Sequence, residues 1–543
     1  MKQYVKCSLF MIMVIVILTV ILGDALAISS TSYSSEVLGL TEGWVKVVSG
    51  GFNDTNNIGI NNFVDFKGYR YASVVNFETG GEIWRTKNGD QWEKIGLDGL
   101  GNSNNSGILL FIFRDSLYAG TYNDEDGAEI WISSDGINFK KIVSGGLGDK
   151  DNVGIGIPII FNGKLLVPVQ NGNLGSIKDG AEIWISEDGE HFQRSIKGGL
   201  GERSNFLIYF LAQPFEQHKY IGFQAIIFNG YVYLGTYNPT GGEIWRSKDG
   251  VNWEKMIDEG FGDTGNIAVH PDRVFRDKLY VVSFNLNGLN VFRSNDGKVW
   301  EKVVENGFGA GKYENNFGVL NEINGSLYLS TFSTPAIGAF QIWKSNDGKN
   351  WTQVGLTGFG NKNNHGAGIS LLSDGFLYVS TLNAFDGLEV WKSRDGLNWE
   401  MIFKEEAVSK THTGGGIVEL NNHLYMYIYD SVEGMEIWKY MNPLQPITTI
   451  QTSVTTSIYT TPTLKTTLQT ESITSTLHTA QTTKSPNTES ASISTQTIGT
   501  HETVRGIMDY ILIGVIAIVT IAVIFIVLKI KVLARPPPPP PPQ

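Results

Sequence analysis

Cysteine is nearly absent from this sequence, because the only one, Cys7, lies close to the N-terminus. The rest of the chain therefore has no disulfide, and a zinc site built on thiolates is excluded. The eight histidines are scattered without HExxH spacing, and no Gly-x-Ser-x-Gly sequence marks a nucleophile elbow. The common signatures of zinc hydrolases and α/β-hydrolases are thus missing, and we predict no catalytic residue.

Basic residues are fewer than acidic residues. Lys and Arg number 42 against 54 Asp and Glu, which gives a formal net charge of −12. Nucleic acid binding depends on cations that neutralise phosphates. The charge balance therefore argues against nucleic acid as a partner.

Long apolar runs are confined to the two ends of the chain. The first, Leu9–Leu22, follows two lysines and precedes an Ala-Leu-Ala sequence that ends at Ala27. This order is typical of a secretory signal, so we predict a signal peptide over residues 1–27 and a linker over 28–43. An uncleaved signal anchor is the alternative. An exported domain without cysteine is typical of prokaryotic surface proteins, including archaeal ones.

The second apolar run, Tyr510–Leu528, has nineteen residues without a charge. We predict a transmembrane helix over 508–528, and the basic residues of 529–543 predict a cytoplasmic tail, which also holds seven consecutive prolines. Residues 443–505 are rich in Thr and Ser and predict a disordered stalk. We therefore expect a single-pass protein of the plasma membrane, with the central region, 44–442, outside the cell. The sequence does not indicate its oligomeric state.

The central region repeats one unit eight times, and its best copy is Gly242–Met256, GEIWRSKDGVNWEKM. Apolar–polar alternation predicts a strand, Asp-Gly predicts a tight turn, and Trp-Glu-Lys predicts a returning strand. The spacing ranges from 47 residues (Glu82 to Glu129) to 61 residues (Glu182 to Glu243), a period typical of propellers and solenoids. The copies begin at Glu82, Glu129, Glu182, Glu243, Asn290, Gln341, Glu389 and Glu436.

The stretch Ser247–Trp253, with the order Ser-x-Asp-Gly-x-x-Trp, resembles the Asp-box, or bacterial neuraminidase repeat. This resemblance implies a sialidase-like β-propeller more firmly than it implies an activity. The Arg-Ile-Pro signature of sialidases is missing. Further matches are Ser294–Trp300, Ser345–Trp351 and Ser393–Trp399; Phe139 and Phe192 replace the Trp in two copies, and Asn88 replaces the Asp in another.

Two more short strands precede each hairpin, so each unit predicts a four-stranded antiparallel blade. Trp44–Val48 aligns with the fourth strand of a unit but has no hairpin before it, whereas the last copy, from Glu436, lacks a fourth strand. We expect these two ends to pair and close the ring. The predicted fold is all-β, a single β-propeller with eight blades, or alternatively seven. The thirteen Trp residues fall in two registers of the repeat, which favours core packing over ligand stacking.

The loops between the second and third strands are expected on one face, together with the loops between blades. In propellers generally this face binds ligands. Amides and aromatic residues suit hydroxyl-rich ligands such as glycans; the alternative is that Asn only suits the turn geometry. The candidate ligand-binding residues are Asn76, Asn123, Asn171, Asn238, Asn285 and Asn383, with Tyr122, Tyr237 and Phe284.

Two neighbouring features break the symmetry of the repeat: an enlarged loop from Asn171 and an insert, RSNFLIYFLAQPFEQHKYIG, from Arg203. We expect Tyr209 and Phe210, with the other aromatic residues of the insert, to form a recognition wall. The Gly-rich loops between blades resemble neither a complete Ca²⁺ site nor any other cofactor site. Asp149 and Asp151 are the best candidates for Ca²⁺, with ordinary turns as the alternative.

These observations favour a cell-surface binding module for a glycan or a surface protein. They lean against an enzyme, because no catalytic constellation is evident. A glycoside hydrolase or polysaccharide lyase is the first alternative, and a passive scaffold of the cell envelope is the second.

Overall fold

The computed structural model describes residues 41–172, 180–205, 225–335, 337–372, 374–383, 385–405 and 412–442. The predicted signal peptide, stalk, transmembrane helix and tail lie outside the described residues. Within the described ranges, no helix is both long enough and apolar enough to cross a bilayer.

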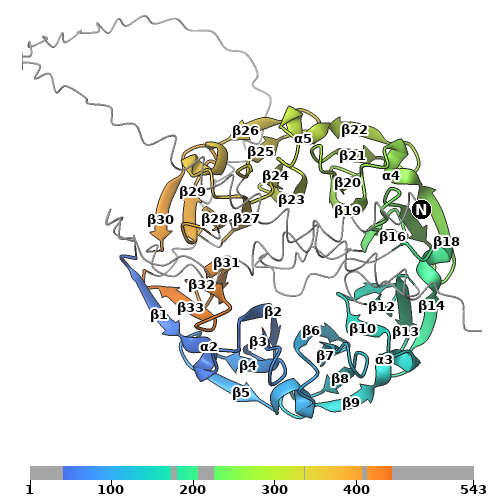
Figure 1. The fold of residues 1–543 in the computed structure, drawn as a ribbon, viewed down its shortest axis with the longest axis vertical. Helices are drawn as coiled ribbons and strands as arrows, with labels where there is room; N and C mark the ends of the chain where they lie inside the picture. The colour runs from blue at the N-terminus through green and yellow to red at the C-terminus, as the bar shows by residue number, and fades with distance from the viewer. Residues whose placement is uncertain are drawn as a thin grey trace, which may run out of the picture. The chain divides into compact units, whose positions relative to one another are not determined.

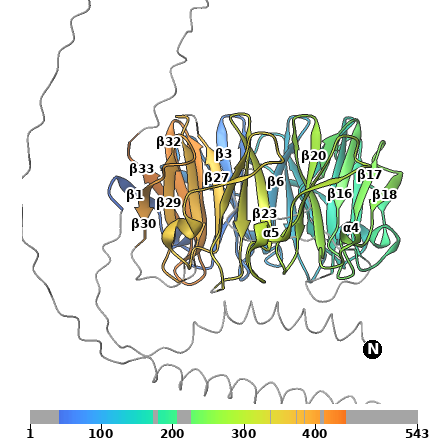
Figure 2. The same ribbon diagram turned by 90° about the horizontal axis from the view of Figure 1, so that it is seen from above.

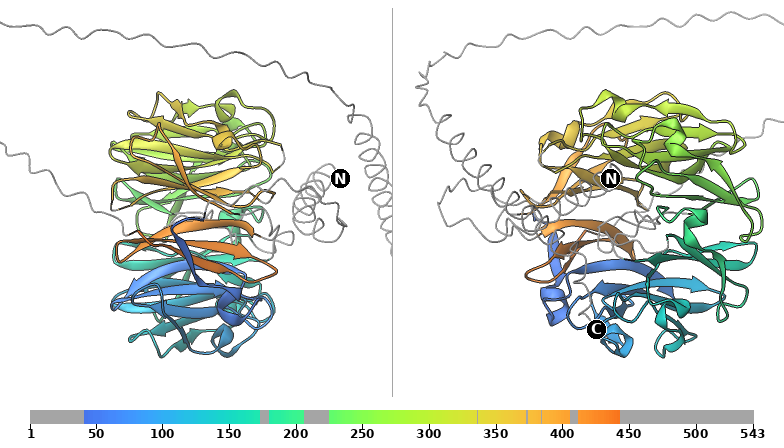
Figure 3. Two further views of the ribbon diagram at one scale, coloured as in Figure 1. Left: turned by 90° about the vertical axis from the view of Figure 1, so that its left-hand side faces the viewer. Right: turned by 45° about the vertical axis from the view of Figure 1, so that its right-hand side comes forward.

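The described strands form sheets arranged radially around one axis (Figure 1). Six sheets have four antiparallel strands and a seventh has nine. The strands run along the axis, as the views in Figures 2 and 3 show. Within a sheet, the first strand lies nearest the axis and the fourth lies outermost. The mostly-β propeller predicted from the repeat is thus confirmed.

Five of the four-stranded sheets are continuous in the chain. They are β2–β5 (Gly59–Phe66, Tyr69–Val75, Glu82–Thr86, Trp92–Ile95), β15–β18 (Ile226–Phe228, Tyr231–Gly235, Ile244–Ser247, Trp253–Ile257), β19–β22 (Ala268–Phe275, Lys278–Phe284, Val291–Ser294, Glu301–Val304), β23–β26 (Phe317–Ile323, Ser326–Phe332, Ile342–Ser345, Thr352–Val354) and β27–β30 (Gly366–Leu371, Leu377–Leu382, Glu389–Ser393, Glu400–Lys404).

The nine-stranded sheet contains two successive units of the repeat, which join where Gly154 of β10 pairs with Tyr122 of β7. Its strands are β6 (Gly107–Phe113), β7 (Ser116–Tyr122), β8 (Ile130–Ser133), β9 (Lys140–Val143), β10 (Asn152–Ile155), β11 (Ile159–Phe161), β12 (Lys164–Asn171), β13 (Glu182–Ser186) and β14 (Gln193–Ile196).

The remaining sheet joins the two ends of the described ring. Strand β1 (Trp44–Val48) pairs antiparallel with β33 (Glu436–Tyr440), which pairs with β32 (His423–Asp430) and then β31 (His412–Leu420). Trp44 lies opposite Tyr440, and its indole nitrogen donates to the carbonyl of Ile402 at 2.9 Å. The predicted pairing of the two ends is therefore confirmed.

The hairpin between the third and fourth strands closes on its own side chains. In the copy at Ser247, the serine hydroxyl accepts a hydrogen bond from the Gly250 amide at 2.9 Å. One oxygen of Asp249 accepts from the amides of Val251 (2.8 Å) and Asn252 (2.7 Å). The tight turn predicted at Asp-Gly is present, and its side chains bind N–H groups of the turn that would otherwise have no partner.

The glycine of this hairpin also packs against the neighbouring sheet. Gly136 has φ +77°, and a Cβ there would lie 2.1 Å from the hydroxyl oxygen of Tyr71. Gly297 repeats the arrangement against Tyr233, also at 2.1 Å. Both tyrosines are fully buried. Any side chain at these glycines would therefore collide with the core between two sheets.

Because of the aspartates in these hairpins, we expect the stability of the protein to decrease in acid. Backbone N–H groups hold their pKa values below the ordinary range in Asp135, Asp249, Asp347 and Asp395, and backbone and His191 hydrogen bonds do so in Asp188. Because the folded pKa is depressed, the stabilisation is present above the unfolded value of about 4 and is lost as pH falls below it.

We expect the urea midpoint of unfolding to fall between pH 5 and pH 3. A variant with asparagine at these five positions and at Asp296, whose pKa backbone N–H groups also lower, should show a smaller fall. Asn88 naturally accepts the same amide bonds, from Asp90 at 3.1 Å and Gln91 at 3.0 Å. Equal falls in both proteins would contradict this assignment.

The Gly-rich loops between sheets form single turns in which a glycine and the next residue both have positive φ. In α5 (Asn306–Gly309), Phe308 has φ +65° and stacks on Trp343 with ring centroids 3.6 Å apart. These loops therefore insert an apolar side chain between two sheets. The others are α2 (Gly50–Asn53), α3 (Gly145–Gly148), α4 (Glu259–Gly262), η1 (Asp98–Gly101), η2 (Gly198–Gly201) and η3 (Thr357–Gly360).

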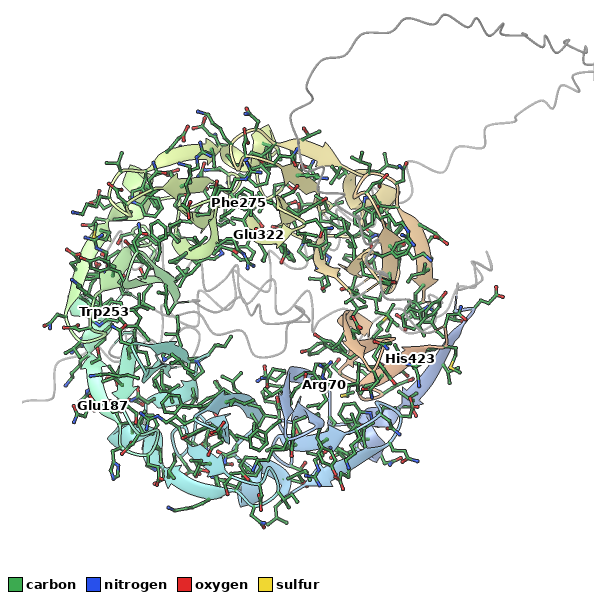
Figure 4. The ribbon with its side chains drawn as sticks, turned by 180° about the vertical axis from the view of Figure 1, so that it is seen from behind. Arg70, Glu187, Trp253, Phe275, Glu322 and His423 are labelled. Atoms are coloured by element: carbon green, nitrogen blue, oxygen red, sulfur yellow. The ribbon has the colours of Figure 1, made fainter. Side chains whose placement is uncertain are left out.

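The first strands line the inside of the ring, and the fourth strands lie on its outside. Figure 4 places Glu322 of β23 on the inner side, and Glu187 and Trp253 on the outer side. Apart from Trp44, the tryptophans are half-buried. They pack between neighbouring sheets. The predicted role in core packing is therefore confirmed, although these side chains are only half-buried.

Candidate functional site

The loops after the second strands and the loops between sheets lie on the same face, which we call the loop face. Two hydrogen bonds join the two kinds of loop. Asn76 donates to Asp54 at 3.1 Å, and Asn363 donates to Asp386 at 2.7 Å. The described ends of the chain meet at the opposite ends of the strands, where the Met441 amide donates to the Gly43 carbonyl at 2.8 Å.

The asparagines predicted to bind ligand lie beneath the loop face, and each is 0–1% exposed. Their amide nitrogens donate to a second asparagine, in the preceding loop between sheets, over 2.8 to 3.0 Å. The pairs are Asn76 with Asn57, Asn123 with Asn105, Asn171 with Asn152, Asn238 with Asn205, Asn285 with Asn266, and Asn383 with Asn364.

The second asparagine continues the network to a buried carboxylate. Asn105 donates to the Gly99 carbonyl at 2.8 Å and to Glu129 at 2.9 Å. Glu129 also accepts from the indole of Trp131 at 2.9 Å and from Lys141 at 2.7 Å. This carboxylate is 3% exposed and is therefore supplied with the donors that a buried charge requires. The sheets containing Glu82, Glu182, Glu243 and Glu389 repeat the arrangement.

The amide oxygens of the predicted asparagines shape the loops above them. In Asn383 this oxygen accepts from the amides of Phe385 at 2.9 Å and Asp386 at 2.8 Å. Asp430 performs the same function for Val432 at 2.7 Å. These side chains therefore hold tight turns in which Phe385 and Val432 are exposed.

The aromatic candidates lie at the ends of the second strands. Tyr122 is half-buried, and burial, with the nearby Asp124 carboxylate, raises its pKa to about 12. Tyr237 is 7% exposed, and Phe284 packs near Phe317 with centroids 6.4 Å apart. The predicted recognition wall, including Tyr209 and Phe210, lies outside the described residues, as does most of the enlarged loop after Asn171.

The two Ca²⁺ candidates belong to one loop between sheets. The Asp149 side chain accepts a hydrogen bond from the Asp151 amide at 3.0 Å, which closes the turn after α3. Across the described part of the chain, no three His, Cys, Asp or Glu residues come together as a metal site.

The second-to-third loops of the loop face carry exposed apolar residues that the sequence analysis did not identify. Phe77 is 55% exposed, Ile337 52%, Phe385 39% and Val432 59%. They come from the second-to-third loops of four sheets that follow one another around the ring, those starting at β23, β27, β31 and β2 (Figure 1). We call these four residues the apolar arc.

Three members of the arc are followed directly by a carboxylate, in the pairs Phe77-Glu78, Phe385-Asp386 and Val432-Glu433. Glu78 and Glu433 are exposed, and Asp386 is half-buried. Burial alone would raise the pKa of Asp386, but hydrogen bonds from three asparagine side chains, led by Asn363, lower it below the ordinary range. The arc thus alternates apolar and acidic groups.

The described residues include two histidine–carboxylate pairs. His270 lies 3.4 Å from Asp272, and exposed His191 lies 2.6 Å from Asp188 in a hairpin. Between described residues, no serine hydroxyl forms a hydrogen bond with a histidine ring.

No family model matches this chain, and no curated protein matches it either. Solved structures with a similar fold include one from an analysis of two prolyl endopeptidases, with a TM-score of 0.41, 12% identity, and coverage of 69% of this chain and 55% of that chain. Puromycin hydrolase matches with a TM-score of 0.41 and 9% identity over 74% and 62%.

The β-propeller domain of the Trilobed protease from Pyrococcus furiosus, described as having an open velcro topology, matches with a TM-score of 0.34 and 12% identity over 65% of this chain and 99% of that chain. The chain spans 55–62% of the length of the first two peptidases.

These findings correct two sequence-based conclusions and bear on a third. The resemblance to sialidase-like Asp-box proteins is wrong, since no family model matches and the neighbours above are peptidases. The Ser-Asp-Gly hairpin fills a local hydrogen-bonding need, and a fold can meet that need without belonging to that family. The prediction of a surface module for a glycan or surface protein, with its hydrolase, lyase and scaffold alternatives, is also overturned. The sequence argued against an enzyme, and this conflicts with neighbours that are enzymes.

Proposed function

We propose that this chain has a serine peptidase-like function, in which the loop face holds a peptide segment for hydrolysis. The apolar arc is the observation that supports this proposal. Large apolar side chains that are exposed on neighbouring loops favour an interaction site. Here they come from four loops, of which two are held in shape by buried asparagines, Asn76 and Asn383, and a third by Asp430.

The chemistry of the arc suits a peptide better than a sugar. Its exposed groups are phenyl rings, branched aliphatic chains and carboxylates. The asparagine amides that would serve a hydroxyl-rich ligand donate instead to other asparagines beneath the surface, as in Asn123 to Asn105 at 2.9 Å. Apolar pockets with a few oriented polar groups are the usual means of binding peptide side chains.

The test uses the full-length protein and a library of internally quenched peptides, with fluorescence anisotropy for binding and dequenching for cleavage. We expect binding that the triple variant Phe77→Ser/Phe385→Ser/Val432→Ser weakens at least tenfold. A serine-directed fluorophosphonate probe then reports whether this chain itself holds the reactive serine or serves another chain.

A matched control is available on the opposite face. Ile137, Val251 and Leu397 are 47%, 47% and 58% exposed in the Ser-Asp-Gly hairpins. Their triple serine variant should bind peptides as the natural protein does. Equal effects of the two triple variants, or the absence of peptide binding altogether, would reject the proposal.

We also propose that the ring has eight blades and faces the outside of the cell. The nine-stranded sheet holds two units of the repeat, and six further sheets complete the count. A crystal structure of the protein tests the number of blades. Digestion of intact cells by an added protease tests the location, because an outward ring would be cut without lysis.

A further inference from the structure

We propose that the peptides selected by the loop face alternate apolar and basic side chains. This inference rests on the proposed function and names its substrate class. The arc provides the complementary pattern, because apolar residues from three neighbouring sheets are each followed by an acidic one.

The carboxylates of Glu78 and Glu433 are exposed, while Asp386 is half-buried and accepts from the Asn363 amide at 2.7 Å. Within the described ranges, Glu78, Asp386 and Glu433 take part in no salt bridge. Many other carboxylates of the ring are paired, as Glu129 is with Lys141 at 2.7 Å. Uncompensated charges of one sign attract and orient a partner of the opposite sign.

Among the second-to-third loops that the structure describes, an exposed apolar residue followed by a carboxylate occurs only after β3, β28 and β32. In the loop after β7, the residues that follow Asn123 are Asp124, Glu125 and Asp126, and no exposed apolar residue accompanies them. The pairing of an exposed apolar group with an acidic neighbour therefore distinguishes the sheets that begin at β27, β31 and β2.

The pairs are also oriented by their loops. Asp430 accepts hydrogen bonds from the amides of both Val432 at 2.7 Å and Glu433 at 2.8 Å, and Asn383 does the same for Phe385 and Asp386. Because both members of each pair are fixed on one tight turn, an apolar contact and an acidic contact are presented side by side.

The test measures the binding of three labelled twelve-residue peptides to the full-length protein. They alternate Leu with Arg, Leu with Gln, or Leu with Glu. We expect Leu-Arg to bind at least tenfold more tightly than Leu-Gln, and Leu-Glu to bind most weakly. The preference for Leu-Arg should shrink as salt rises from 50 to 500 mM, because exposed charges are screened.

The variant Glu78→Gln/Asp386→Asn/Glu433→Gln should lose the preference for Leu-Arg over Leu-Gln while keeping Leu-Gln binding. The control variant Asp124→Asn/Glu125→Gln, on the same face, should keep the preference. Binding that is independent of peptide charge, or an equal loss in both variants, would overturn this inference and leave the proposed function standing. No binding of any peptide would overturn both.

Discussion

Replacing Trp44 by alanine is expected to lower the free energy of unfolding by about 3 to 5 kcal/mol, the usual range for a large aromatic side chain removed from a core. Trp44 is 6% exposed and lies in β1, the strand that joins the two ends of the ring. Its ring packs edge-on against Phe403 at 5.5 Å and tilted against Tyr440 at 5.0 Å. Its loss would weaken the contact on which closure depends.

Urea denaturation of the protein, followed by tryptophan fluorescence and circular dichroism, measures this change. Val45 is the matched control, since it lies in the same strand but is 47% exposed; Val45→Ala should change the free energy by less than about 0.5 kcal/mol. Trp44→Phe should recover most of the packing and lose only the bond to Ile402. A loss below about 1 kcal/mol in Trp44→Ala would show that closure does not depend on this side chain.

The second large effect is expected for Asn105→Ala, at about 3 kcal/mol. Asn105 is fully buried and makes three hydrogen bonds: to Gly99, to Glu129 and from Asn123. Alanine would leave the amide of Asn123 and one donor position of a buried carboxylate without their partner. An unsatisfied buried polar group costs more than an average hydrogen bond contributes.

The control for this prediction is the preceding residue. Asn104 is exposed, and its amide donates to Asp126 at 3.0 Å, so Asn104→Ala should stay within about 0.5 kcal/mol. Thermal and urea unfolding of both variants give the comparison. If the two substitutions destabilise the protein equally, the buried network does not hold the loops between sheets as we describe.

The repeat made the sheets and their order predictable. The alternation around Trp245 and the turn at Asp249-Gly250 depend on neighbours within a few residues, so their geometry can be read locally. The closure by β1 was predictable for a related reason. One end of the repeat lacked a fourth strand, the other end held a spare one, and unpaired strand edges favour pairing.

The candidate site was less predictable. Asn123 and Asn105 are eighteen residues apart. Nothing in the local sequence indicates that the side-chain amide of Asn123 donates to that of Asn105 below the surface. Phe77 followed a predicted site residue directly, yet its exposure was not evident from the sequence. One feature of the sequence could have indicated the arc. In three of the second-to-third loops an apolar residue is followed by an acidic one, whereas another loop has two acidic residues, Asp124 and Glu125, at this place.

The sequence by itself determined the strand period, the hairpin turns and the pairing of the two ends, because each follows from hydrogen bonds and side-chain alternation over short stretches. Only the tertiary structure decided which polar groups are buried and which apolar groups face the solvent. Burial at Asn105 or exposure at Phe77 depends on the sheets and loops packed around each residue, and those neighbours come from distant parts of the chain.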